Sequence, residues 1–185
     1  MRFLALFDVL VLDWKNNQVG LQRQSQCEVP ASPDQEWVCF RWWDMIEAPA
    51  DRSNGFVVVD ADVSDQSVEV IVDTGSNFDL VIPRSATARE PWTSVLQAQK
   101  PIMLHTSTGA HMSRRYTFRG NFVLGGCMFH ELQVVDVDDS TLPPGMRLLP
   151  IIGTPLLRRF DSVTLDFARR MVGFESCRQG TKTAR

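Results

Sequence analysis

Residues 70–76 read Val70-Ile71-Val72-Asp73-Thr74-Gly75-Ser76, and this stretch decides how the rest of the chain is interpreted. An apolar run typical of a buried strand ends at once in a carboxylate, a hydroxyl and a glycine. Burying an ionisable group against such a run costs free energy unless the group has partners, so its position predicts chemistry at Asp73. A second strand-like stretch, residues 77–83, follows and ends in proline. The pattern predicts a strand, a polar loop that carries one carboxylate, and another strand.

The bulk composition limits the class of protein. At 185 residues the chain can bury one full core and is too short for two ordinary domains. Its 44% hydrophobic and 22% charged residues are typical of a globular chain. A formal net charge of −3 gives no electrostatic footprint for nucleic acid. No apolar stretch approaches the roughly 18 residues of a membrane-spanning helix. We expect a soluble protein with no nucleic-acid partner and no membrane span.

The first twelve residues superficially resemble a secretory signal. Asp8 interrupts the apolar run, Asp13 follows it, and no small-residue cleavage site comes next. A strand is the better interpretation, which slightly favours a cytoplasmic location and leaves the compartment open.

The cysteines do not form a metal-binding pattern, since none belongs to a Cys-x-x-Cys pair: they are Cys27, Cys39, Cys127 and Cys177. We expect neither a metal nor another cofactor. Cys27 and Cys39 could close a small loop in an oxidising compartment. Four reduced thiols in a cytosolic protein are the alternative, and both interpretations stay open.

The two ends of the chain contain a repeat. Residues 7–21 align without gaps to residues 160–174, with six of fifteen positions identical. Each copy is typical of a strand, a polar turn and a second strand. Apart from chance similarity, two explanations remain. The first copy is either the tail of a preceding lobe or an added hairpin in the same sheet as the carboxy-terminal copy. The closeness of the repeat to Met1 favours the preceding lobe.

From residue 56 onward, short strands and tight turns follow one another and predict an all-β fold. Residues 56–63 and 67–72 form a predicted hairpin that leads into Asp73. A second hairpin is expected between 102–105 and 115–118, with its tip at residues 106–110. A third turns at Gly125-Gly126. One short helix is expected near the carboxy terminus, with Thr154 as N-cap and Pro155 at the first helical position.

A second motif accompanies the first. Ile151-Ile152-Gly153 ends an apolar strand and is followed by the short helix and the 163–174 hairpin. The strand and Asp-Thr-Gly loop, then a hydrophobic-hydrophobic-glycine strand, a helix and a terminal hairpin, resemble the order of elements in retropepsin-like aspartic proteases. Ser76 and residues 77–83 are closer to the pepsin-like pattern, and the single tyrosine, Tyr116, lies away from the predicted flap tip.

This resemblance implies an all-β, retropepsin-like closed β-barrel or sandwich with one short helix near the carboxy terminus. It covers residues 55–176, taken as a protease domain. Residues 1–54 would form an amino-terminal hairpin and linker, and residues 177–185 a tail.

The resemblance also implies an aspartic endopeptidase in which Asp73 is catalytic. Its loop would be supported by Thr74, Gly75 and Ser76, the flap over substrate would be formed by Thr106, Ser107, Thr108, Gly109 and Ala110, and Ile151, Ile152 and Gly153 would pack next to the loop. Hydrolysis of this kind needs two carboxylates, and the chain has one Asp-Thr-Gly. The expected partners are therefore a peptide or protein substrate and either a second copy, as a homodimer, or a missing upstream lobe. A catalytically silent module for dimerisation or peptide binding is the alternative.

Overall fold

The computed structural model describes residues 7–22, 35–39, 41–43, 56–106, 109–141, 149–178 and 181–182. Its strands are β1 (Val9–Asp13), β2 (Gln18–Gln22), β3 (Gln35–Cys39), β4 (Arg41–Trp43), β5 (Phe56–Val63), β6 (Gln66–Asp73), β7 (Leu80–Pro83), β8 (Leu96–Ala98), β9 (Ile102–Thr106), β10 (Gly109–Ser113), β11 (Arg115–Phe118), β12 (Phe122–Leu124), β13 (Cys127–Phe129), β14 (Gln133–Val137), β15 (Ile151–Gly153), β16 (Phe160–Asp166), β17 (Met171–Cys177) and β18 (Thr181–Lys182). The helix α1 spans Thr154–Leu157, and short 3-10 turns occupy Arg84–Ala86 and Asp139–Thr141. The prediction of an all-β fold with one short helix near the carboxy terminus is confirmed.

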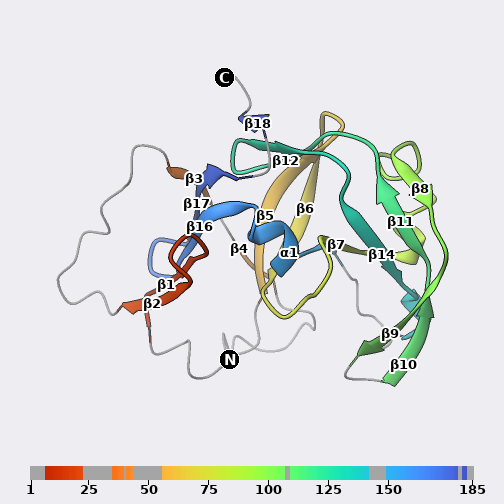
Figure 1. The fold of residues 1–185 in the computed structure, drawn as a ribbon, viewed down its shortest axis with the longest axis horizontal. Coiled ribbons are helices and arrows are strands. Elements are labelled where there is room, and N and C mark those ends of the chain that lie inside the picture. Colours follow the sequence, from red (N-terminus) through yellow and green to blue (C-terminus); the bar gives the residue numbers. More distant parts are fainter. Residues whose placement is uncertain are drawn as a thin grey trace.

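The larger sheet carries the Asp-Thr-Gly motif. Its strands lie in the order β18-β13-β12-β5-β6-β15-β7-β14-β11-β8, with β4 added on β5 (Figure 1). This order is linear, so the described strands do not close into a barrel. The predicted hairpin of β5 and β6 is present, and it turns at Ser64 and Asp65, both with positive φ. Two pairings at its centre are parallel, β15 with β6 and β14 with β7.

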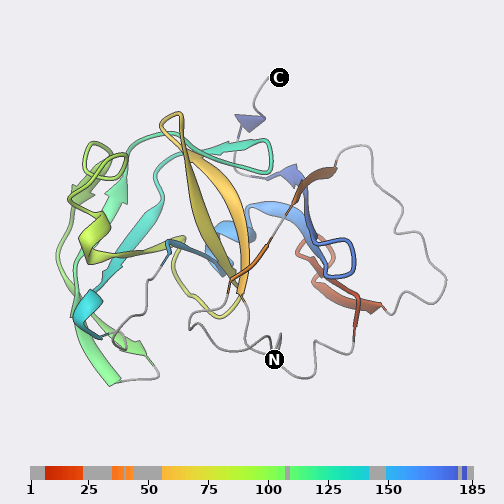
Figure 2. The same ribbon diagram turned by 180° about the vertical axis from the view of Figure 1, so that it is seen from behind.

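The smaller sheet joins the two ends of the chain in the order β2-β1-β16-β17-β3. Its red amino-terminal hairpin lies directly beside its blue carboxy-terminal hairpin in both views (Figures 1 and 2). The two copies of the sequence repeat are therefore neighbours in one sheet, as one of the two explanations of the repeat expected.

A single core connects the two sheets. Five phenylalanines are among its fully buried side chains: Phe118, Phe122, Phe129, Phe160 and Phe174. Phe160 of the smaller sheet lies 5.3 Å from Phe129 of the larger one, between ring centroids, and 4.9 Å from Phe174. Each such side chain contributes about 1.5–3 kcal/mol on burial, so the contact holds the smaller sheet against the larger one.

The hairpin predicted as a flap differs from its predicted form. The strand that pairs with β9 is β10, whereas Arg115–Phe118 pairs with β14 and β8. The chain changes partners at Arg114, whose backbone N–H donates to Oδ1 of Asp136 at 2.9 Å. Because Asp136 is buried in the larger sheet, this bond directs the chain from the hairpin into that sheet.

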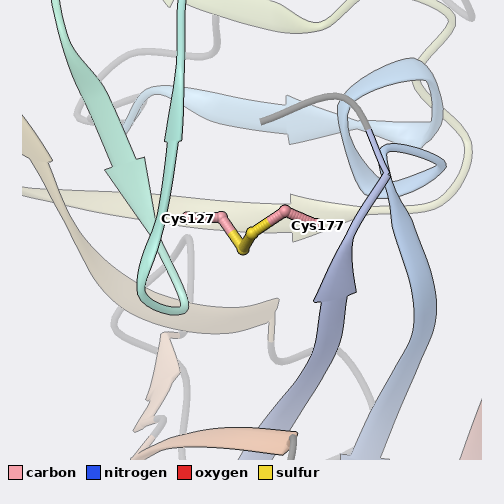
Figure 3. The surroundings of a disulfide bond; sticks show 2 residues. All are labelled: Cys127 and Cys177. Carbon is pink, nitrogen blue, oxygen red and sulfur yellow. A yellow bond between two sulfur atoms is a disulfide. The ribbon is translucent and has the colours of Figure 1, made fainter. Parts of the chain in front are cut away.

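A disulfide joins Cys127 of β13 to Cys177 at the end of β17, with 6.0 Å between their Cα atoms (Figure 3). It links the two sheets covalently. Neither sequence-based expectation included this pair, and the interpretation of four reduced thiols is wrong for these two cysteines. The alternative pair involves Cys27, which lies outside the described residues.

None of the helices in the described part of the chain is long and apolar enough to cross a membrane. The division of the chain at residues 54 and 176 stays a prediction.

Candidate active site

Asp73 is the last residue of β6, a strand in the interior of the larger sheet. The three residues before it are buried, whereas Asp73 itself is half-buried. On one side β5 pairs with β6, and on the other β15 runs parallel to it, with Gly153 opposite Asp73. The sheet therefore holds the backbone of Asp73 on both sides and places its carboxylate where the strand meets a loop.

The loop after Asp73 folds back on the carboxylate. The N–H of Gly75 donates to Oδ1 of Asp73 at 2.8 Å, and the N–H of Ser76 donates to the backbone oxygen of Asp73 at 3.3 Å. A Cβ atom at position 75 would lie 3.2 Å from Oδ1, so a larger residue would crowd this bond. Among the described residues none bonds Oδ2. One carboxylate oxygen is thus fixed, and the other is available to a water molecule or a second carboxyl group.

The chain that follows β15 braces this loop. The Thr154 hydroxyl donates to the carbonyl of Thr74 at 2.7 Å, and the Thr154 N–H donates to the carbonyl of Ser76 at 3.0 Å. The sequence predicted Thr154 as the helix N-cap, but Gly153 holds that position, and no side chain caps the helix. Thr154 therefore braces the loop at 73–76 instead of capping the helix.

Gly153 allows the end of β15 to approach the chain at residues 76–78. A Cβ atom there would lie 2.2 Å from the backbone oxygen of Phe78 and 2.8 Å from that of Ser76, distances that real Cβ atoms do not adopt. Its N–H donates to the carbonyl of Asp79 at 3.1 Å. The glycine predicted to lie next to the loop is thus in direct contact with it.

A buried ion pair is formed by Asp79, three residues after the loop at 73–76, and sequence reasoning missed it. Asp79 is 3% exposed, and its Oδ2 accepts from the guanidinium of Arg159 at 2.9 Å and from the N–H of Gln133 at 2.8 Å. Asp79 Oδ1 has no hydrogen-bond partner among the described residues. The carboxylate lies within the run 77–83, so the signal that identified Asp73 was present here too.

A second cluster of charged side chains anchors the hairpin of β9 and β10 at its base. Arg84 binds Asp136 with two bonds, 3.0 Å from Nε to Oδ2 and 3.2 Å from Nη2 to Oδ1, and it also pairs with Asp138. Nη2 of Arg84 also donates to the carbonyl of Met112 on β10 at 3.4 Å. The hydrogen bond to Asp136 raises the pKa of Arg84, and hydrogen bonds from Ser140, ahead of the charge of Arg84, lower the pKa of Asp138. The sequence contained no signal for this long-range pairing.

The structure describes only part of the predicted flap. Thr106 ends β9, Gly109 and Ala110 begin β10, and Ser107 and Thr108 lie outside the described residues. Met103 and Met112 face each other across the hairpin and are 53% and 56% exposed. The hydrogen bonds described for the loop at 73–76 come from the loop itself and from Thr154.

A cavity of about 610 Å³ lies elsewhere, between β6, the end of β7 and residues 84–92. Glu69, Ser85 and Trp92 are among its lining residues, and Asp73 is not. Within the described ranges, no group of three or more His, Cys, Asp or Glu side chains could hold a metal ion.

Comparison with models of known protein families finds no match to this sequence, and comparison with curated proteins finds none either. Among solved structures, the chain is similar to the crystal structure of a retropepsin-like aspartic protease from Rickettsia conorii. The TM-score is 0.48 and the sequence identity 15%, over 80% of this chain and 93% of that chain. Similarity at this level concerns the course of the backbone and assigns no residue a role.

Proposed function

We propose that this chain supplies one half of an aspartic endopeptidase active site, with Asp73 as one of its two carboxylates. The observation that carries the proposal is the state of the Asp73 carboxylate. One of its oxygens is held by the N–H of Gly75, the other is bonded by no described residue, and the surrounding loop is braced by Thr154. A carboxylate kept half-buried and oriented in this way suits a water-activating group better than a structural one.

The proposed reaction follows from the chemistry of two adjacent carboxyl groups. One ionised carboxylate takes a proton from water as the water attacks the peptide carbonyl, and the other, protonated, donates to the carbonyl oxygen. A shared proton is the established behaviour of such a pair, because two carboxylates a hydrogen bond apart do not both ionise. Asp73 takes either role, depending on which partner holds the proton. Thr74 and Ser76 are proposed to support the pair from the loop.

The proposed substrate is an extended peptide with apolar residues around the scissile bond. The exposed methionines of the flap hairpin support this preference, since an adaptable apolar surface suits side chains of varied shape. Residues 106–110 are proposed to close over the peptide and exclude water.

Replacement of Asp73 tests the proposal. In the chain assembled with its second carboxylate, Asp73→Asn is expected to leave folding intact and to abolish cleavage of a mixed peptide library, because the amide cannot act as a base. Asp62→Asn is the matched control, since Asp62 is an exposed carboxylate on β5. A pepstatin-like inhibitor should block the parent chain once the second carboxylate is supplied. Equal turnover by the Asp73→Asn variant would remove Asp73 from the mechanism.

A catalytically silent module for dimerisation or peptide binding is the second candidate. One observation favours it: β1 of the same chain already occupies the edge of β16, where a second copy could add its own terminal strand. Calorimetry distinguishes the candidates. A silent module would bind peptides without cleaving them under any mode of assembly, and Asp73→Asn would leave the binding affinity unchanged.

A further inference from the structure

The cavity beside β6 lies apart from the loop at 73–76. Ser67, one of its lining residues, is near the start of β6, and Asp73 is the last residue of that strand. At roughly 3.3 Å for each strand residue, the two positions are about 20 Å apart. The cavity has a volume of about 610 Å³, which is in the range of pockets that bind small ligands or short peptide segments. Its chemistry can therefore be considered separately from that of Asp73.

The walls of the cavity are apolar and rigid. Four of its lining residues are buried: Pro83, Pro91, Trp92 and Leu149. Trp92 is 3% exposed, and its ring packs edge-on against that of Phe118, with 6.4 Å between the centroids. Proline rings and an indole held by a neighbouring ring need little rearrangement to receive a ligand. The interior is thus already shaped for an apolar group.

The rim of the cavity is acidic. Three carboxylates and one guanidinium are among the described lining residues: Glu69, Glu90, Asp139 and Arg89. Three negative charges against one positive charge leave a formal charge of −2 on these residues. Glu90 and Asp139 are both exposed. A ligand that complements this cavity therefore has an apolar body and a cationic tip.

The two exposed carboxylates are held in place and can still accept hydrogen bonds. The N–H and the hydroxyl of Ser85 each donate to Asp139 at 2.8 Å, and the Ser94 hydroxyl donates to Oε2 of Glu90 at 2.8 Å. A carboxylate has about four lone-pair positions, so both groups have acceptor positions left. A guanidinium presents five N–H donors in a planar fork, which matches carboxylates better than the point charge of an ammonium group.

We propose that this cavity is a binding site for a segment of another protein in which an arginine stands beside apolar residues. The apolar side chains pack against Pro91 and Trp92, and the guanidinium binds the carboxylates of Glu90 and Asp139 at the rim. The site does not include Asp73, so it goes beyond the proposed function and does not depend on it.

The test uses the peptide acetyl-Leu-Arg-Leu-amide, titrated into the full chain and followed by NMR. Shifts are expected at the amides of Ser67 and Ala86 and at the indole N–H of Trp92, all of which line the cavity. The same peptide with citrulline in place of arginine has nearly the same shape and no charge. It should bind at least about tenfold more weakly, because it loses the charge-assisted hydrogen bonds. Equal affinities, or no shifts at these three residues, would overturn the proposal.

Two charge reversals provide the matched control. Glu90→Lys and Asp62→Lys each replace an exposed carboxylate and change the net charge of the chain equally, but only Glu90 lines the cavity. Glu90→Lys should weaken binding of the arginine peptide by at least about tenfold, and Asp62→Lys by no more than about twofold, because solvent screens distant exposed charges. Arg89→Gln should instead tighten binding, since it removes the cation from the rim. Equal losses for the two reversals would mean a general attraction to an acidic protein, and the cavity would not be the site.

Replacement of Asp73 separates this inference from the proposed function. Asp73→Asn should leave the affinity for the arginine peptide unchanged. Shifts confined to residues 73–76, or an affinity that Asp73→Asn alters, would place the peptide at the proposed active site and overturn the cavity proposal. Loss of cleavage together with unchanged binding at the cavity would support both proposals.

Discussion

Gly153 is the residue at which the end of β15 comes into close contact with the loop after Asp73. Gly153→Ala is expected to destabilise the protein by about 1–3 kcal/mol or more, because the new Cβ would overlap the backbone oxygen of Phe78, which cannot move aside as a side chain could. Gly20→Ala is the matched control, since its Cβ would meet Val11 at an ordinary 3.4 Å. Urea denaturation of both variants measures the difference, and equal stabilities would contradict the crowding argument.

Asp79, three residues after the same loop, forms a buried ion pair with Arg159. Arg159→Met should cost about 3–5 kcal/mol, because it leaves a buried carboxylate without its cation. Arg119→Met breaks an ion pair whose two side chains are both exposed, and it should cost at most about 1 kcal/mol. Adding Asp79→Asn to Arg159→Met should restore part of the lost stability. No recovery would mean that the arginine acts through packing rather than charge.

At this scale the sequence predicted the residues but few of their partners. Asp73 and Gly153 could be found because each ends an apolar run, a local signal. Arg159 could not be assigned to Asp79, because the two are far apart in the chain and any of several arginines could have reached that carboxylate. Thr154 was placed at a helix start correctly, but its hydroxyl bonds a carbonyl of another segment, which local capping rules do not anticipate.

At the scale of the elements, removing the disulfide between β13 and β17 is expected to lower the stability of the fold. Replacing both Cys127 and Cys177 by serine should lower the stability by about 4 kcal/mol, the chain-entropy value for a sequence separation of 50. Thermal unfolding with and without reductant measures it. Reductant should lower the melting temperature of the parent chain and leave the double variant unchanged. A parent chain insensitive to reductant would show that the two thiols are not paired in solution.

Element prediction succeeded where turn residues are explicit and failed where strands change partners. Gly125-Gly126 and the hairpin before Asp73 were found from local patterns, and both glycines have positive φ. The predicted partner of β9 was wrong, because Arg115–Phe118 has the composition of a hairpin strand. Nothing in the neighbouring sequence shows that the backbone N–H of Arg114 donates to Asp136. The disulfide was missed for the same reason, since four cysteines leave their pairing open.

For the whole molecule, the central expectation concerns how activity depends on pH once a second carboxylate is present. Cleavage should be fastest at mildly acidic pH, because the pair must hold one proton. The rate should fall at higher pH as both carboxyls ionise, and at lower pH as both become protonated. A pH profile of kcat/KM on a fixed apolar peptide measures this. A flat rate between about pH 4 and 8 would speak against a shared proton.

The fold class of the whole molecule could be predicted from the sequence, but the way its two terminal hairpins pair could not. Strand spacing indicated an all-β chain, and the repeat indicated two related hairpins. Their side-by-side pairing in one sheet is a contact between the two ends of the chain, and residue patterns alone left it as one of two explanations. The register of β1 on β16 places the two hairpins side by side in one sheet.

The covalent link between Cys127 and Cys177 also sets how the protein responds to force. Tension applied to the two ends of the chain would pass through the sulfur atoms and bypass the intervening residues, which include Gly153, Thr154 and Arg159. The fully extended molecule would be shorter by about 170 Å, at roughly 3.4 Å for each residue across a separation of 50. An ATP-driven unfoldase pulling on one end would therefore stretch the strand that carries Asp73. Residues 128–176, which include the segments that brace that strand, would bear no tension.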